Sequence, residues 1–245
     1  MEQIWLLIPV VIFAAVVRGF SGFGFAAIAV VGLNVFLAPQ QSVAIVLSLD
    51  LICSMNLWRQ ALKQADFTTL KRLVCGSLLG IPLGYALLLL LPTEILKILI
   101  CITILFSCLL LLSEYKPFNT DKTGTKIGFG LASGAGTASA SVGGPMIVYY
   151  MLSSNLSTSS QRATMILFFI ASEACAIVVL IAGGLVDSTL PNALLILVIP
   201  TLVSVHYGQY LFNRKPPQSL KSFALPVLMT VALFGIINST LTLLR

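Results

Sequence analysis

The chain has 245 residues, of which 58% are hydrophobic and 9% charged, and its mean hydropathy is +1.03. Soluble proteins carry about 25% charged residues. This composition therefore excludes a water-soluble domain and predicts an all-α polytopic membrane protein that lies in a lipid bilayer. We interpret the formal net charge of +6 as a bias in the loops, and expect no nucleic-acid partner.

The first apolar segment covers residues 3–17 and leads into Arg18 and a cluster of small residues at 21–24. Apolar sequence then continues to residue 38. In hydrocarbon an unpaired backbone group costs several kcal/mol, so a break in a helix is tolerated only where it is buried in protein or lines a cavity. We therefore expect this break to line a functional cavity.

Three spans complete the first half of the chain, and a basic loop at residues 59–72 separates the first two. They are expected at residues 43–58, 73–91 and 94–113. The longest polar linker follows at residues 114–126. It divides one membrane domain into an N-terminal repeat, residues 1–113, and a C-terminal repeat, residues 127–245.

The second half opens with a longer cluster of Gly, Ser and Ala at residues 130–145. Three spans follow, at about residues 163–183, 191–212 and 219–243. Small residues therefore interrupt the apolar sequence early in each half, a pattern that points to the binding site of a transporter.

Matching residues recur in the two halves in the same order, with a separation of 120 that becomes 124 further along. The pairs are Ser21 and Ser141, Gly24 and Gly144, Gln41 and Gln161, Gly84 and Gly208, Pro92 and Pro216, Leu96 and Leu220, and Lys97 and Lys221. This ordered series predicts an internal duplication.

The basic residues orient the two repeats. Loops 59–72, 114–126 and 214–215 hold four, three and two Lys or Arg residues, whereas loops 38–41, 92–96 and 184–191 hold none. With the basic loops in the cytoplasm, the repeats are inverted and both termini face the periplasm, across the cell inner membrane. The pieces 125–138 and 146–152 are too short to span a bilayer, which favours a re-entrant hairpin before the three spans of each repeat. Full spans at 3–38 and 127–152 remain the alternative.

Two half-helix N-termini that face one cavity would bind an anion, because unpaired N–H groups and the positive dipole end converge there. Arg18 could pair with the anion, and the helix that follows each hairpin could reach back into the cavity. The alternative is structural: the glycines allow close helix packing, and the arginines mark cytoplasmic helix ends. The substrate-binding candidates are Arg18, Ser21, Gly22, Phe23, Gly24, Gln41, Ser139, Ser141, Gly143, Gly144, Gln161 and Arg162.

Ionisable residues inside spans indicate proton coupling or a fixed pair. Asp50 and Glu173 are the carboxylates placed well inside spans, and His206 titrates near neutrality when unperturbed. These three residues are the candidates for proton coupling, and helix-to-helix hydrogen bonds are the alternative role for each.

The sequence contains no catalytic motif, so we do not expect an enzyme. Five cysteines lie in apolar runs without C-x-x-C spacing, and with a single His no metal site and no cofactor are expected. The protein is expected to be a monomer or a homodimer.

Two sequence stretches carry a family resemblance. Ser21-Gly-Phe-Gly-Phe with Ser42-Val-Ala-Ile, and Gly143-Gly-Pro-Met-Ile-Val with Gln161-Arg-Ala-Thr, resemble the TauE/SafE sulfite-exporter family of membrane permeases over essentially the whole chain. The resemblance implies secondary transport of sulfite, a sulfonate or a sulfoacetate-like anion. Phe23 and Phe25 stand where the family often has glycines, and these aromatic side chains favour a larger or aromatic sulfonate. Gln41 stands near a position where a basic or His residue is frequent in the family. The alternatives are a passive anion channel and a membrane subunit of a larger complex.

Overall fold

The structure is a computed structural model that describes residues 2–112, 118–185, 189–214, 226 and 229–237. The described residues are helical almost throughout and include no strand, which confirms the all-α prediction. The helices are α1 (Glu2–Ser21), α2 (Phe25–Leu33), α3 (Pro39–Ala61), α4 (Phe67–Leu90), α5 (Thr93–Leu112), α6 (Thr123–Ala140), α7 (Gly144–Ser153), α8 (Thr158–Ala182) and α9 (Thr189–Arg214). Most of the span expected at 219–243 lies outside the described residues, although residues 229–237 are helical.

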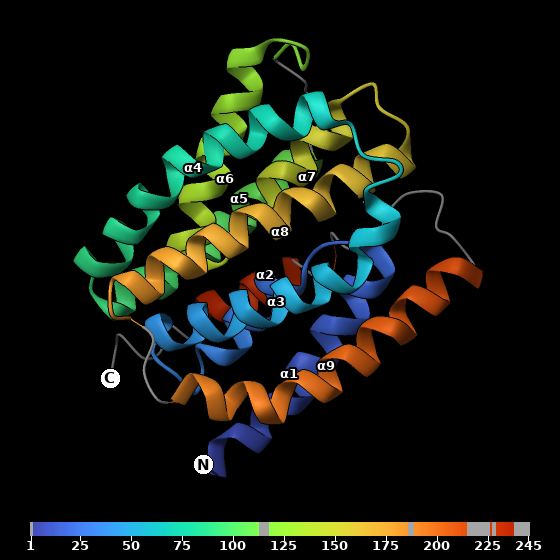
Figure 1. Ribbon diagram of the computed structural model, residues 1–245. Helices are drawn as coiled ribbons and strands as arrows, with labels where there is room; N and C mark the ends of the chain where they lie inside the picture. The colour runs from blue at the N-terminus through green and yellow to red at the C-terminus, as the bar shows by residue number, and fades with distance from the viewer. Residues whose placement is uncertain (1, 113–117, 186–188, 215–225, 227–228, 238–245) are drawn as a thin grey trace.

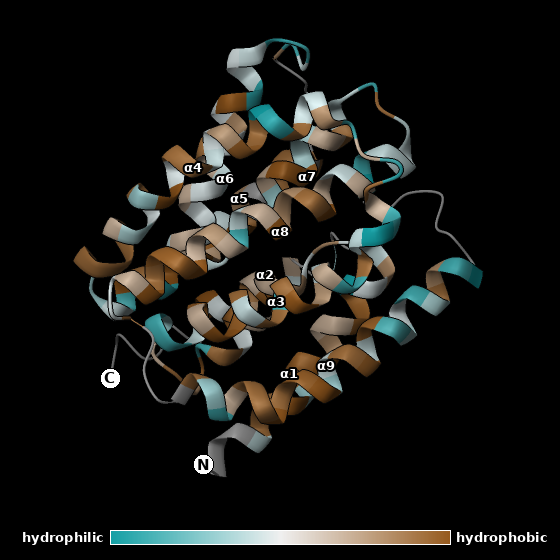
Figure 2. Ribbon diagram, viewed as in Figure 1, coloured by the Kyte–Doolittle hydropathy of each residue, from teal (hydrophilic) through white to brown (hydrophobic). Residues whose placement is uncertain are grey.

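Five of these helices, namely α3, α4, α5, α8 and α9, are long and apolar enough to cross a membrane. Large hydrophobic side chains also cover the outer surface: Leu90 is 79% exposed on α4, and Leu195 is 76% exposed on α9. Figure 2 shows that hydrophobic residues make up much of α4 and α9. Such a large exposed apolar surface is unfavourable in water and favourable in contact with lipid acyl chains. The polytopic membrane architecture is therefore confirmed.

Each break predicted from small residues is the turn of a helical hairpin. On the first hairpin Gly32 of α2 lies against Val10 of α1. On the second, the Phe129 ring of α6 lies 5.4 Å from the Tyr150 ring of α7, measured between centroids. In both cases residues on opposite sides of the break are in contact, so the chain doubles back at residues 22–24 and 141–143.

The tightest helix packing joins the two halves of the chain. Helix α4 packs against α6, and α1 packs against α9. At Gly80 of α4 a Cβ atom would collide with the carbonyl oxygen of Leu131, and at Gly208 of α9 with that of Val16. Small residues let helix backbones approach to contact distance in membranes. The first helix of each half is thus packed against the fourth helix of the other half.

Helices α3 and α8 lie side by side in the middle of the molecule, between the α1 and α9 layer and the α4 and α6 layer (Figure 1). Both carry buried polar residues in otherwise apolar surroundings, among them Asp50 on α3 and Glu173 on α8. The site described below lies at this central contact.

The linker predicted at 114–126 is shorter in the structure, because α6 begins at Thr123. Lys126 is charged and was therefore assigned to the loop, yet its Nζ atom is buried and donates to the hydroxyl of Thr69, 3.0 Å away on α4. A hydrogen-bonded lysine is accommodated in the first turn of a buried helix.

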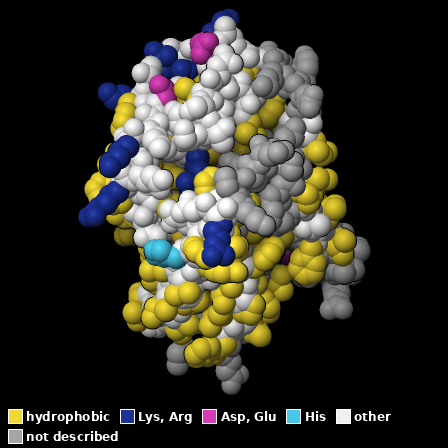
Figure 3. Space-filling model, turned by 90° about the vertical axis from the view of Figure 1, so that its right-hand side faces the viewer, with side chains coloured by type: hydrophobic (Ala, Val, Ile, Leu, Met, Phe, Trp, Pro, Cys, Tyr) yellow, Lys and Arg dark blue, Asp and Glu magenta, His cyan; other side chains and the backbone are white. Residues whose placement is uncertain are grey.

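Basic side chains gather at one end of the bundle. They come from the end of α3 (Arg59), the start of α4 (Lys71 and Arg72), the start of α6 (Lys122) and the end of α9 (Arg214). Figure 3 shows Lys and Arg side chains grouped on one face, next to a hydrophobic area. This grouping is what loops on one side of a membrane would produce.

Candidate functional site

The first hairpin turn depends on backbone conformations that favour glycine. Gly22 and Gly24 have φ angles of 81° and 95°, in the left-handed region that side chains rarely enter. The hydroxyl of Ser21 lies 2.8 Å from the Val17 carbonyl oxygen and 2.7 Å from that of Phe23. These contacts stabilise the end of α1 at Ser21, and α2 begins at Phe25.

The second turn is built differently. Ser141 takes the left-handed conformation, with φ of 56°, and α7 begins at Gly144 with Pro145 in its first turn. Proline suits this position because its missing N–H is not needed there. The Ser133 hydroxyl donates to the carbonyl oxygen of Gly143 at 2.8 Å, and the Ser141 hydroxyl donates to that of Val43 on α3 at 3.2 Å. The latter bond fastens the turn to the central helix.

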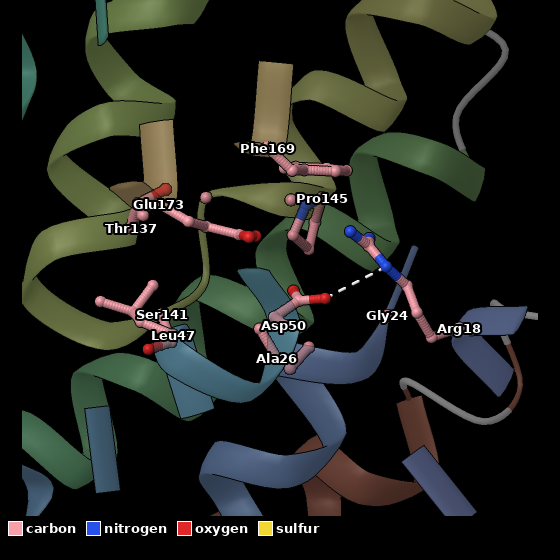
Figure 4. Close-up of a pocket in the computed structure, with 13 residues that line it drawn as sticks. Arg18, Gly24, Ala26, Leu47, Asp50, Thr137, Ser141, Pro145, Phe169 and Glu173 are labelled. Atoms are coloured by element: carbon pink, nitrogen blue, oxygen red, sulfur yellow. Dashed lines mark ion pairs between the residues drawn. The ribbon is translucent and has the colours of Figure 1, made fainter. Parts of the chain in front are cut away.

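Both turns border one small cavity between α3 and α8, shown in Figure 4. Its lining comes from Arg18 of α1; Gly24, Ala26 and Ala27 around the start of α2; Leu47 and Asp50 of α3; Thr137, Ser141, Gly143, Gly144 and Pro145 around the second turn; and Phe169 and Glu173 of α8. The volume open to the centres of water molecules is about 20 Å³. That is enough for a water molecule and too little for a sulfonate, so the cavity is closed in this conformation.

Arg18 is the positive charge of the cavity and is almost fully buried. Its Nε lies 3.1 Å from Asp50 Oδ1, an ion pair whose geometry is not that of a hydrogen bond. The remaining nitrogens donate to the carbonyl oxygen of Gly22 at 3.0 Å and to the hydroxyl of Ser54. The guanidinium also lies 4.8 Å from the centre of the Phe169 ring. Arg18 is thus paired, stacked and held at the first turn.

Asp50 and Glu173 form a buried pair of acidic side chains. Figure 4 shows both pointing into the cavity, from α3 and α8, so two acidic groups share one buried space. Two ionised carboxylates in one buried space repel each other, and the single cation Arg18 among the cavity-lining residues can balance one of them. With Arg18 positive and one carboxylate ionised, the cavity is then electrically neutral.

The structure places part of the predicted set around this cavity. Seven predicted residues line it: Arg18, Gly24, Asp50, Ser141, Gly143, Gly144 and Glu173. Four others lie at or near the turns without lining it, namely Ser21, Gly22, Phe23 and Ser139; the Ser139 hydroxyl donates to its own helix, at the carbonyl oxygen of Ala135.

The remaining predicted residues lie away from the cavity. Gln161 donates to the Leu156 carbonyl oxygen in the loop before α8, and Gln41 is in the first turn of α3. Arg162 lies against Gly22 and the ring of Phe212. His206 is exposed on α9, 3.2 Å from the side-chain amide of Asn56.

Sequence reasoning missed two polar or aromatic partners of Arg18. Phe169 stands four residues before Glu173 on α8, and Ser54 stands four residues after Asp50 on α3. Side chains four apart share one helix face, so helical spacing from the two carboxylates could have found both. Among the described residues, no group of three or more His, Cys, Asp or Glu side chains could hold a metal ion.

One family model, described as sulfite exporter TauE/SafE, matches residues 7–235 of the chain. The match covers the two hairpins, the cavity and all five long apolar helices. No curated protein and no solved structure matches the chain.

Proposed function

Because the chain belongs to the TauE/SafE sulfite-exporter family of membrane transporters, we propose that it is a secondary transporter of a sulfur-containing anion, such as sulfite, a sulfonate or a sulfoacetate-like compound. The observation that carries this proposal is the meeting of both hairpin turns and a buried arginine at one closed cavity in the middle of the bundle.

The cavity has the features of an anion site. The first turns of α2 and α7 border it from two sides, through Gly24, Ala26 and Ala27 and through Gly143 and Gly144. Their unpaired N–H groups and positive dipole ends favour negative charge. Arg18 supplies a formal positive charge. Oxygens of a sulfite or sulfonate group are suitable acceptors for both kinds of donor.

The charges suggest how an anion could enter. The Arg18 guanidinium is neutralised by the Asp50 and Glu173 pair when that pair holds one proton. A monovalent anion would leave the cavity with an uncompensated negative charge, which is costly away from water. A second proton on the carboxyl pair would restore neutrality and free Arg18 from Asp50. Anion and proton then bind together, and transport carries no net charge.

The closed cavity supports a carrier more than a passive channel. An anion larger than water needs the helices around the cavity to separate before it can enter. Alternating exposure of a midplane site to the two sides is the mode of transporters built from repeats. The reciprocal packing of α1 with α9 and of α4 with α6 supports two related repeats. We propose that they are inverted and lie in the cell inner membrane, with both termini on the periplasmic side.

Uptake into proteoliposomes tests the proposal. The purified chain is reconstituted, and uptake of ³⁵S-labelled sulfite and of ethanesulfonate, a monovalent sulfonate, is measured with and without an inward proton gradient. We expect at least one anion to accumulate only with the gradient, and an imposed potassium diffusion potential to leave that uptake unchanged. Uptake that follows the potential and ignores the proton gradient would instead identify a channel.

A further inference from the structure

Arg162 is a second arginine near the first hairpin turn, and no acidic side chain in the described part of the chain forms an ion pair with it. It lies in the second turn of α8, is half-buried, and is separate from the residues that line the cavity. The ion pairs among the described residues join Arg18 with Asp50 and Lys97 with Glu94, and do not include Arg162.

The unpaired atoms of Arg162 are specific ones. Its Nε and Nη2 are buried and have no hydrogen-bond partner among the described residues. These two nitrogens lie along the same edge of the guanidinium, and their N–H bonds point in parallel. That edge matches the oxygens of a carboxylate, sulfonate or phosphate group in a bidentate contact. A buried charged donor without an acceptor is costly, so this edge favours binding of an oxyanion.

Neighbouring groups among the described residues hold the guanidinium in place without hydrogen-bonding to this edge. The plane of the group lies over the ring of Phe212 on α9, 4.7 Å from its centre. A Cβ atom at Gly22 would lie 3.1 Å from Cγ of Arg162 and 3.2 Å from its Nε. Glycine therefore leaves the room that the arginine occupies beside the turn. Arg18 lies at the same turn, because it donates to the carbonyl oxygen of Gly22.

From these contacts we propose that the Nε and Nη2 edge of Arg162 is a second oxyanion site, beside Gly22 of the first turn and outside the cavity lining, where the transported sulfite or sulfonate binds before it reaches Arg18. The identity of the ligand rests on the proposed function, and the site itself rests on the unpaired edge. The edge is shielded from water in this conformation, so the anion reaches it when α9 and the turn separate. Two arginines flanking one glycine turn then provide successive positions for the anion.

Calorimetry on the purified full chain tests the site, with sulfite and ethanesulfonate as probes and dimethyl sulfone as a neutral analogue. Arg162→Lys keeps the positive charge but removes the bidentate edge. We expect it to raise the Kd for sulfite by about tenfold or more, with the thermal unfolding midpoint of the wild type. Arg214→Lys is the matched control, because Arg214 is also stacked on an aromatic ring, Tyr210, but is exposed. It should bind sulfite as the wild type does.

An unchanged sulfite Kd in Arg162→Lys would overturn this inference and leave the proposed transport intact. A wild-type protein that binds neither sulfite nor ethanesulfonate would overturn both. If Arg162→Lys does not fold, wild-type crystals grown with selenite, a close analogue of sulfite, decide the matter. An anomalous peak within hydrogen-bonding distance of Arg162 Nε and Nη2 supports the site, and a peak confined to the central cavity contradicts it.

Discussion

Glu173 has no cation of its own in the cavity. Arg18 makes its ion pair with Asp50, whereas the Glu173 Oε2 atom is buried without a hydrogen-bond partner among the described residues. Burying an unpaired negative charge is far more costly than burying a neutral carboxyl group. Glu173 can therefore gain and lose a proton while the ion pair between Arg18 and Asp50 stays intact.

Replacing Glu173 by Gln fixes this position in its neutral form. We expect Glu173→Gln to retain exchange of labelled for unlabelled anion across proteoliposomes but to lose accumulation driven by a proton gradient. His206→Gln is the control, because His206 is titratable but exposed on α9, away from the cavity. Its gradient-driven accumulation should match the wild type. Accumulation by Glu173→Gln at the wild-type level would remove Glu173 from the coupling mechanism.

Gly144 marks where α7 begins at the cavity. A Cβ atom there would lie 3.6 Å from the Phe169 ring, in ordinary van der Waals contact, so a larger side chain would project into the space beside Phe169. We expect Gly144→Leu to abolish anion binding measured by calorimetry. Gly128→Leu is the control, because no atom lies within 4 Å of the Cβ position at Gly128 on α6. Equal losses in both variants would mean that glycine at 144 serves packing alone.

At the scale of helices, α4 begins with a charged cap. The Asp66 carboxylate accepts a hydrogen bond from the backbone N–H of Thr69 at 2.6 Å. The backbone N–H of Asp66 donates to the Thr164 hydroxyl of α8 at 2.9 Å. Partial burial alone would raise the pKa of Asp66, but the hydrogen bonds from Thr69 outweigh it, and the pKa lies below the ordinary value of 3.8. The ionised form thus stabilises the start of α4.

Asp66→Ala should lower the free energy of unfolding by about 0.5–2 kcal/mol near neutral pH, the usual range for an N-cap. Because the folded-state pKa is lowered, this stabilisation is present above pH 3.8 and is lost as the pH falls through the folded-state value. The difference between the thermal unfolding midpoints of Asp66→Ala and the wild type should therefore become smaller as the pH is lowered. Ser157→Ala is the control, because it removes the hydroxyl cap of α8, and a serine hydroxyl does not titrate. The loss of free energy of unfolding in Ser157→Ala should stay constant over the same pH range.

At the scale of the whole molecule, the basic residues and the hairpins together define a topology. Arg59, Lys122 and Arg214 lie at the end of α3, the start of α6 and the end of α9, and Figure 3 shows Lys and Arg side chains grouped on one face. An excess of Lys and Arg marks cytoplasmic loops. The termini of the chain would then face the periplasm.

Cysteine labelling checks this topology. A cysteine placed at Lys63 or Lys122 should react with a membrane-impermeant maleimide only after the cells are opened, whereas one placed at Thr93, at the start of α5, should react in intact cells. The native cysteines are first replaced, since Cys75 is exposed. Labelling at position 122 in intact cells would contradict the inverted-repeat topology.

Much of this architecture follows from sequence because its physical causes are local. Hydrocarbon demands long apolar helices with their backbone groups paired, so apolar length alone predicted α3, α4, α5, α8 and α9. Clusters of small residues predicted both breaks. The turn at Gly22 and Gly24, for example, has positive φ angles that residues with a side chain rarely adopt. The family was also recognisable from these clusters.

Only the tertiary structure decided which polar residues meet. Asp50, Glu173 and His206 looked alike in sequence, because each is an ionisable residue in an apolar span. The packing of α3 against α8 brings the two carboxyl groups to Arg18, whereas α9 turns His206 outward. Arg18 and Arg162 were likewise equivalent candidates in the sequence. In the structure Arg18 pairs with Asp50, whereas the Nε and Nη2 edge of Arg162 has no hydrogen-bond partner among the described residues. Such pairing depends on rotation and contact between helices far apart in the chain, which the composition of each helix does not specify.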